Sequence, residues 1–182
     1  MDVTKAIYQR RTVHLFEKKK INENLILDAI NAANQAPCHK LTFPWRFYSV
    51  GLKKRIEILD FAITLKSQIR ELDDKAKNII REKFLNPSHL LIASQILNDD
   101  KFTQKEDYAA CSCAIQNLSI SLASNGISTK WSTGEITRCS EIYDILNLDS
   151  INEEIIGFIW IGYGKKLANI KRPSVSQIYK VI

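Results

Sequence analysis

The side chains best suited to chemistry in this 182-residue chain are four cysteines, three histidines and 26 lysines and arginines. Cys111 and Cys113 form a C-x-C rather than the C-x-x-C of redox and zinc sites, and His39 and His89 lie far from both in the sequence. The sequence therefore predicts no metal site. Four cysteines are also too few for a disulfide-built secreted domain, which favours free thiols in a reducing cytoplasm.

The most suggestive basic segment is Arg10 and Arg11, followed by Thr12 and His14. Read by themselves, the two arginines would end a first helix, where cations interact favourably with the helix dipole. The net charge of +6 and the pI of about 9.1 suit a nucleic acid or an anionic cofactor. The basic residues are scattered, however, and no platform of interleaved aromatic and basic residues is recognisable, so no nucleic-acid partner is expected.

The organisation of the chain indicates one continuous domain over residues 1–182, because no repeat, low-complexity tract or linker interrupts it. No apolar run approaches the roughly 20 residues that a membrane span needs. The first residues do not read as a signal peptide, since Asp2 is acidic and no long apolar stretch follows. We therefore expect a cytoplasmic protein without a membrane partner.

The helices expected from apolar periodicity begin with two that have clear N-caps, at Asp2 and Asn22. The second must end before Pro37, because the residue that precedes a proline is pushed out of the helical region. A stretch of weaker periodicity, 66–86, is most simply a solvated helix, and it could also cover a pocket. The other expected helices span 53–70, 105–125 and 137–147, the last with Thr137 as its cap.

Four strands are expected where β-branched and aromatic residues gather. The last of them is nearly all apolar, which is typical of a strand buried on both faces. Together with the helices they predict an α+β domain whose small sheet is covered by helices. Four strands are few for that much helix, which favours a core shared by two subunits. The expected strands span 45–50, 88–94, 127–131 and 155–161.

Three segments of the chain, in matching order and spacing, resemble the nitroreductase family of FMN enzymes. The first runs from Arg10 to Phe16 and has two basic residues, a hydroxyl, a spacer, a further basic residue and a nearby Phe. The second is Ala36-Pro37, a short loop, and then Pro44-Trp45 at the start of a strand. The third is Trp131-Ser132-Thr133-Gly134 with the apolar strand downstream. The Ala-Pro-x-His-Lys sequence of residues 36–40 is similar to that of a compact bacterial subgroup of the family, the NAD(P)H nitroreductases of about this length.

The resemblance implies a cofactor site. The FMN phosphate would be held by planar arginine forks and by a second cation from the tail. A residue at the position of His14 would stabilise the negative charge of the reduced flavin ring. Residues 121–126 correspond to a stretch that contacts nicotinamide in the subgroup, and His39 would reach the flavin from the other subunit. The implied site residues are Arg10, Arg11, Thr12, His14, Gln35, His39, Asn125, Gly126, Trp131, Ser132, Thr133, Gly134, Lys171 and Arg172.

The resemblance also implies a fold and an activity. The fold would be a small, mostly antiparallel sheet flanked by helices, in a homodimer with flavin at the interface. The activity would be hydride transfer from NADPH or NADH to flavin N5 and then to a small-molecule oxidant such as a nitroaromatic or quinone. No G-x-G-x-x-G follows a strand, so one pocket would serve both partners in turn. No side chain is nominated as catalytic, because the cofactor carries the chemistry.

Departures from the family pattern keep other functions open. Leu41 and Phe43 replace the Asn and Gln that many members have before Pro-Trp, and Gly164 replaces a proline after the last strand. A specialised flavin reaction, such as reductive dehalogenation or ring fragmentation, is one alternative. A non-catalytic flavin-binding protein is another. Trp45 and Trp131 could also be ordinary core aromatics.

Overall fold

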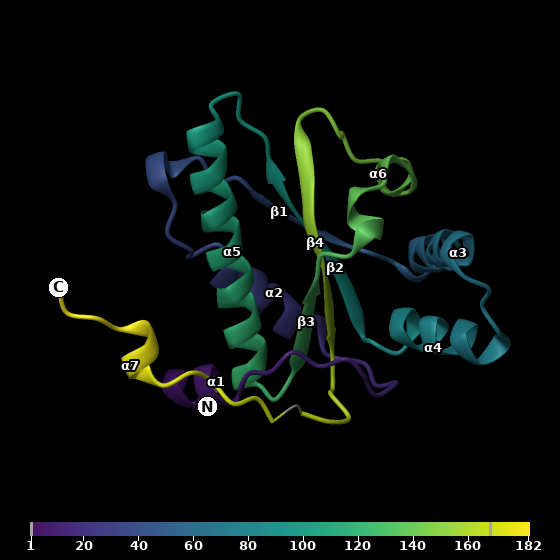
Figure 1. Cartoon of the computed structure of the whole chain (residues 1–182), viewed down its shortest axis with the longest axis horizontal. Helices are drawn as coiled ribbons and strands as arrows, with labels where there is room; N and C mark the ends of the chain where they lie inside the picture. Colours follow the sequence, from purple (N-terminus) through teal and green to yellow (C-terminus); the bar gives the residue numbers. More distant parts are fainter. Residues whose placement is uncertain (1, 168) are drawn as a thin grey trace.

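The computed structural model describes residues 2–167 and 169–182, and it has a four-stranded antiparallel sheet at its centre (Figure 1). The strand order is β1-β2-β4-β3, and every neighbouring pair is antiparallel. The predicted α+β fold is thereby confirmed, with strand bounds within about two residues of those expected from the sequence. The strands are β1 (Trp45–Ser49), β2 (His89–Ile96), β3 (Ser128–Ser132) and β4 (Glu153–Gly162).

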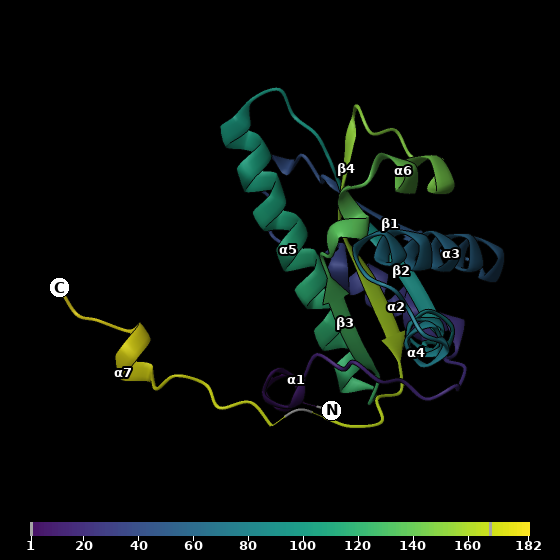
Figure 2. The same ribbon diagram turned by 45° about the vertical axis from the view of Figure 1, so that its right-hand side comes forward.

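Helices cover both faces of this sheet (Figures 1 and 2). Side chains alternate along β2: Leu91 and Ala93 join one buried cluster, and Leu90 and Ile92 join the other. Because both faces are covered, β4 is almost wholly apolar. The first cluster is closed by α2 (Glu23–Ala33) and α5 (Lys101–Ser124), and α1 (Val3–Gln9) packs against α5. The second cluster is closed by α3 (Leu52–Ile69), α4 (Asp74–Leu85) and α6 (Ser140–Leu146).

The helix ends confirm two predicted caps and correct a third. Asp2 accepts a hydrogen bond from the Lys5 amide at 3.2 Å, and Asn22 accepts one from the Asn24 amide at 3.0 Å. Thr137 does not cap a helix, which was the expectation. It is buried in the 3-10 turn η2 (Glu135–Arg138), where its hydroxyl donates to the Gly134 carbonyl, so α6 begins only at Ser140.

The charged stretch 66–86 divides into the end of α3 and the whole of α4. The longest helix, α5, begins earlier than expected because Asp100 accepts a hydrogen bond from the Thr103 amide at 2.9 Å. None of the helices in the described part of the chain combines the length and apolar character that a membrane span requires.

The segment that follows α1 is tied to the sheet at two points. The Val13 amide donates to the Thr129 carbonyl on β3 at 3.2 Å. Further along, the Glu17 amide donates to the Tyr163 carbonyl at 2.8 Å, and the Lys165 amide donates to the Leu15 carbonyl at 3.0 Å. Residues 10–20 therefore lie beside β3 and then beside the turn after β4 (Figure 2). The chain ends in an exposed tail that carries α7 (Val175–Ile178).

Candidate functional site

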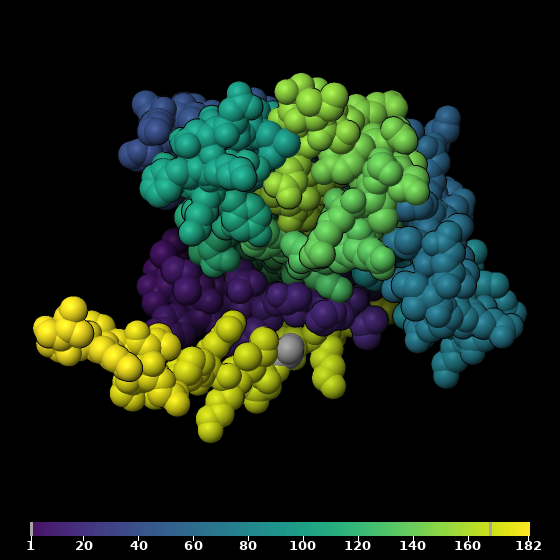
Figure 3. Space-filling view, turned by 45° about the horizontal axis from the view of Figure 1, so that its top comes forward, coloured from purple at the N-terminus to yellow at the C-terminus, as the bar shows by residue number. Residues whose placement is uncertain are grey.

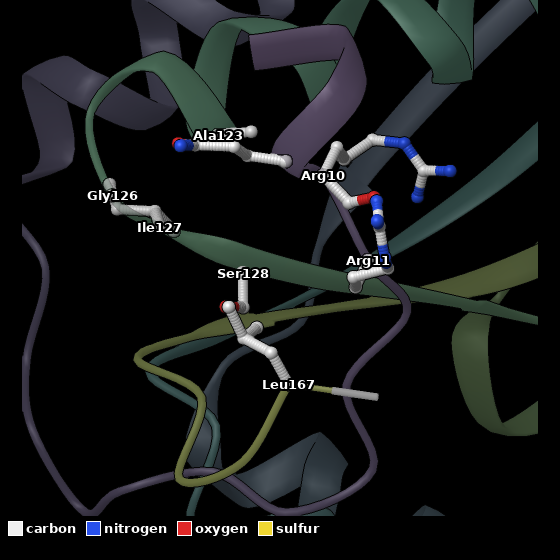
Figure 4. A pocket seen from close by; sticks show the side chains of 8 residues that line it. Arg10, Arg11, Ala123, Gly126, Ile127, Ser128 and Leu167 are labelled. Carbon is white, nitrogen blue, oxygen red and sulfur yellow. The ribbon is translucent and has the colours of Figure 1, made fainter. Parts of the chain in front are cut away.

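A hollow of about 120 Å³ lies between the end of α1, the end of α5 and the start of β3 (Figure 4). Arg10 and Arg11 line one side of it, and Gly126 and Ser128 line the other. Gly126 has φ +72° where the chain turns from α5 into β3, a conformation that favours glycine. The hollow therefore brings together Arg10, Arg11 and Gly126, three of the residues predicted for the site.

Two arginines that form no ion pair among the described residues line this hollow. The pKa of Arg10 is lowered, first by burial and then by the positive charges of Arg172 and Arg11. Arg10 Nε is buried and has no hydrogen-bond partner among the described residues. Arg11 donates to the carbonyl oxygens of Tyr8 at 2.7 Å and of Arg10 at 2.8 Å. A partly buried arginine that has a donor without a partner and lies near two further cations is an arrangement that a phosphate group would stabilise.

The sequence predicts a second cation from the tail, at Lys171 or Arg172. Arg172 is close enough for its charge to act on Arg10. Lys171 is exposed and is not among the described residues that line this hollow. Arg172 is therefore the better candidate for the second cation.

Two further hollows continue along the same segment, and His14 lines both. The first measures about 220 Å³ and is lined by Thr12, His14, Leu15 and Lys166. The second measures about 260 Å³ and lies between residues 14–16, α4 and β3. Thr12 and His14, both predicted for the site, thus lie on the same segment as the two arginines, and their contact with a cofactor stays a prediction. The second hollow is lined by His14, Leu15, Phe16, Ile79, Glu82, Lys83, Asn86, Lys130 and Lys165.

Lys83 and Lys130 are site candidates that the sequence reasoning missed. Burial, followed by the charges of Lys130 and Lys66, lowers the pKa of Lys83 to about 8. Its ammonium lies 6.0 Å from the ring centroids of both Phe84 and Trp160. Burial also lowers the pKa of Lys130. A signal did exist for Lys130: strand alternation places it on the face opposite to Trp131.

The side chains at the end of β3 are engaged within the sheet. Trp131 Nε1 donates to the Ile156 carbonyl at 3.0 Å, and a side chain at Gly157 would collide with its indole ring. Ser132 Oγ accepts a hydrogen bond from Trp160 Nε1 at 2.9 Å. Both side chains thus have structural partners, and their contact with a flavin stays a prediction. Thr133 and Gly134 follow the strand and are exposed.

The remaining predicted residues lie away from the three hollows within this chain. Gln35 follows α2, and His39 opens the 3-10 turn η1 (His39–Leu41), with its Nε2 atom 4.0 Å from a Glu106 carboxylate oxygen. Asn125 ends α5, where its side-chain amide donates to the Ser121 carbonyl at 3.1 Å. Contact of Gln35 and His39 with a cofactor in a second subunit remains a prediction.

Comparison with known families gives a match over most of the chain. The model of the nitroreductase family matches residues 7–163. This range contains most of the residues that line the three hollows. It ends before Lys165, Lys166 and Leu167, which also line them, and before the tail that carries Arg172.

Individual proteins agree with that match. YfhC of Bacillus subtilis (strain 168), named provisionally as an NAD(P)H nitroreductase, is 30% identical over 169 residues, which cover 91% of this chain and 86% of the relative. The structure of a nitroreductase-like family protein from Bacillus cereus covers all of this chain and 96% of its own, with 23% identity and a TM-score of 0.86. An iodotyrosine deiodinase bound to FMN and 3-iodo-L-tyrosine matches 96% of both chains, with 19% identity and a TM-score of 0.75.

Proposed function

Because this chain belongs to the nitroreductase family, we propose that it is an FMN-dependent oxidoreductase that takes hydride from NADPH or NADH and passes it to a nitroaromatic, quinone or similar acceptor. The observation that carries the proposal is the row of three hollows along residues 10–16, which are lined by cations without carboxylate partners at the arginine end. A flavin mononucleotide has a phosphate at one end and an electron-accepting ring at the other. Its two ends match the two ends of this row.

The phosphate would be held at the arginine end. Arg10 offers a buried Nε donor that has no partner among the described residues, and the charges of Arg172 and Arg11 act on it. Arginine forks bind phosphate oxygens in pairs, so an incoming phosphate would satisfy these donors and relieve the repulsion between the three cations. The Thr12 side chain lies next in line and could donate to the ribityl chain.

The flavin ring would lie toward His14, Lys83 and Lys130. When bound, FMN supplies the ring that accepts hydride at N5. The ring gains negative charge when it is reduced, and cations fixed beside it stabilise that charge before the reaction begins. Lys83 and Lys130 are partly removed from water, which strengthens their effect on a neighbouring charge. No side-chain acid, base or nucleophile is required of the chain.

A second copy of the chain would complete the site. We propose a homodimer in which Gln35 and His39 of one subunit approach the flavin of the other. The outward face of α5 supports close packing of two copies, because it carries small residues such as Ala109 and Cys113, which are exposed in the single chain.

The first test is the absorbance spectrum of the purified protein, followed by anaerobic addition of NADPH and then NADH. Bands near 370 and 450 nm that bleach with either donor would support the proposal, with free FMN at the same concentration as the control. A protein that binds FMN but consumes donor no faster than free flavin would be a binding protein rather than an enzyme. A colourless protein that fails to take up FMN would overturn the proposal.

A further inference from the structure

Two lysine clusters that are far apart in the sequence are joined on the surface. Lys18, Lys19 and Lys20 follow the segment that pairs with the turn after β4, and Lys165 and Lys166 belong to that turn. The backbone bonds between Glu17 and Tyr163 and between Leu15 and Lys165 fix the two segments side by side. In Figure 3 the purple N-terminal residues lie directly against the yellow residues that follow β4. We call these five residues the lysine strip.

The lysine strip has little internal neutralisation. All five side chains are exposed, and none forms an ion pair among the described residues. Glu17 is the one acidic residue within residues 14–20 and 163–167. Lys19 is held in place by Tyr163, since its ammonium lies 4.3 Å from the ring centroid. The strip is therefore a positive surface whose charges are not compensated within the described part of the chain.

The lysine strip is continuous with the proposed flavin site. Lys166 lines the hollow that holds Thr12 and His14, and Lys165 lines the next hollow with Lys83 and Lys130. A molecule that reaches either hollow from this side must pass the strip. The electron donor is such a molecule, and it carries several phosphate charges.

We propose that the lysine strip attracts and holds the phosphates of the electron donor, and that it makes the enzyme prefer NADPH to NADH. The inference rests on the proposed function, since it concerns the donor of the same site. NADPH has one more phosphate monoester than NADH, which adds roughly 1.5 to 2 negative charges at neutral pH. The five ammonium groups of the strip therefore attract NADPH more strongly than NADH.

The effect must depend on salt. Electrostatic attraction of a charged ligand to a cleft of opposite charge raises association rates by about 10 to 1,000-fold and weakens steeply as ionic strength rises. The screening length falls from about 30 Å at 0.01 M to about 8 Å at 0.15 M ionic strength. The preference for NADPH is therefore largest in dilute buffer.

The test compares two triple variants that remove the same charge. The first changes Lys18, Lys19 and Lys20 to Gln. The control changes Lys53, Lys75 and Lys101 to Gln, three exposed lysines on α3, α4 and α5. Stopped-flow bleaching of the flavin gives the second-order rate constant for each donor at low and at physiological ionic strength. Adenosine 2′,5′-bisphosphate and AMP, titrated calorimetrically against each protein with and without FMN, give a measurement that needs no turnover.

The strip variant should lose about tenfold in the NADPH rate constant at low ionic strength and less than about threefold with NADH. Its affinity for the bisphosphate should fall while that for AMP changes less, and the control variant should match the wild type. Equal losses for both donors, equal losses in both variants, or an unchanged bisphosphate affinity would overturn the inference. If the protein fails to take up added FMN but still binds the bisphosphate through the strip, the proposed function alone is overturned.

Discussion

Two regions of the molecule treat their charged groups in opposite ways. Along residues 10–20 and the segments beside them, cations gather and lower one another's pKa, and the described residues form no ion pair with a carboxylate there. Around the loop 38–43 and the start of α5, polar groups bind each other and hold a strained backbone. The difference supports the proposal that the first region binds an anionic ligand from outside the chain, whereas the polar groups of the second region stabilise its own backbone.

The backbone of the second region has three residues in an unfavourable conformation. Lys40, Leu41 and Phe43 have φ of +56°, +55° and +46°, although none is glycine. Such conformations cost of order 1–3 kcal/mol each and persist only where the surroundings impose them. Here α5 supplies the surroundings: Asp107 accepts from Thr42 Oγ1 at 2.5 Å, and Thr103 accepts from Lys40 Nζ at 3.4 Å.

The largest expected effect is a loss of FMN affinity when an arginine of the first region is removed. Arg10→Ala removes a partly buried cation whose Nε donor has no partner among the described residues. We therefore expect FMN to bind about 100-fold more weakly, because hydrogen bonds to charged groups contribute about 1.5–3 kcal/mol. Fluorescence titration of flavin-free protein with FMN measures the loss. Arg81→Ala, which removes an exposed arginine of α4, serves as the control. Equal FMN affinity in the Arg10 variant and the wild type would contradict the proposed phosphate site.

The second prediction concerns the loop 38–43, where a substitution should change stability rather than ligand binding. Asp107 is only 4% exposed, and its Thr42 contact is internal to the chain, so Asp107→Ala should lower the free energy of unfolding by about 2 kcal/mol. Urea denaturation measures this change. A double-mutant cycle with Thr42→Val should show that the two losses do not add, because they remove the same contact. Additive losses would mean that Asp107 acts through another partner.

The same contrast explains what the sequence could predict. Periodicity and caps located the strands and most helices, because these signals are local. Alternation along β3 could also have assigned Lys130 to the face opposite Trp131. Lys83 could not be found in this way, since its partners come from residues 14–16, β3 and the turn after β4, and only the sheet order brings these segments together. The strained loop was hidden for a similar reason, because α5 imposes its positive φ angles from a distant part of the chain.

A third prediction sharpens the comparison at Lys83. Its pKa of about 8 means that about half of the Lys83 ammonium groups have lost their proton at pH 8 in the free protein. If the flavin ring binds the charged form, the pKa rises on binding, so the affinity is nearly full at about pH 7 and falls as the pH rises through 8. We expect FMN to bind up to about tenfold more weakly at pH 9 than at pH 7. Lys83→Arg, which stays charged, should flatten this dependence, and a wild-type affinity that is constant over that range would contradict it.

The smallest expected effect concerns His14, which lines both of the hollows proposed for the flavin ring. His14→Ala removes one polar side chain from these linings and leaves Lys83 and Lys130 in place. Because a donor fixed beside the ring stabilises the charge of the reduced flavin, its loss should lower the midpoint potential of the bound flavin. The change should stay below about 30 mV, the value for one tenfold step in a two-electron couple. Spectroelectrochemical titration of both proteins at pH 7 measures it. Identical potentials would mean that the ring charge is stabilised by Lys83 and Lys130 alone, and the ring end of the cationic region would then begin beyond His14.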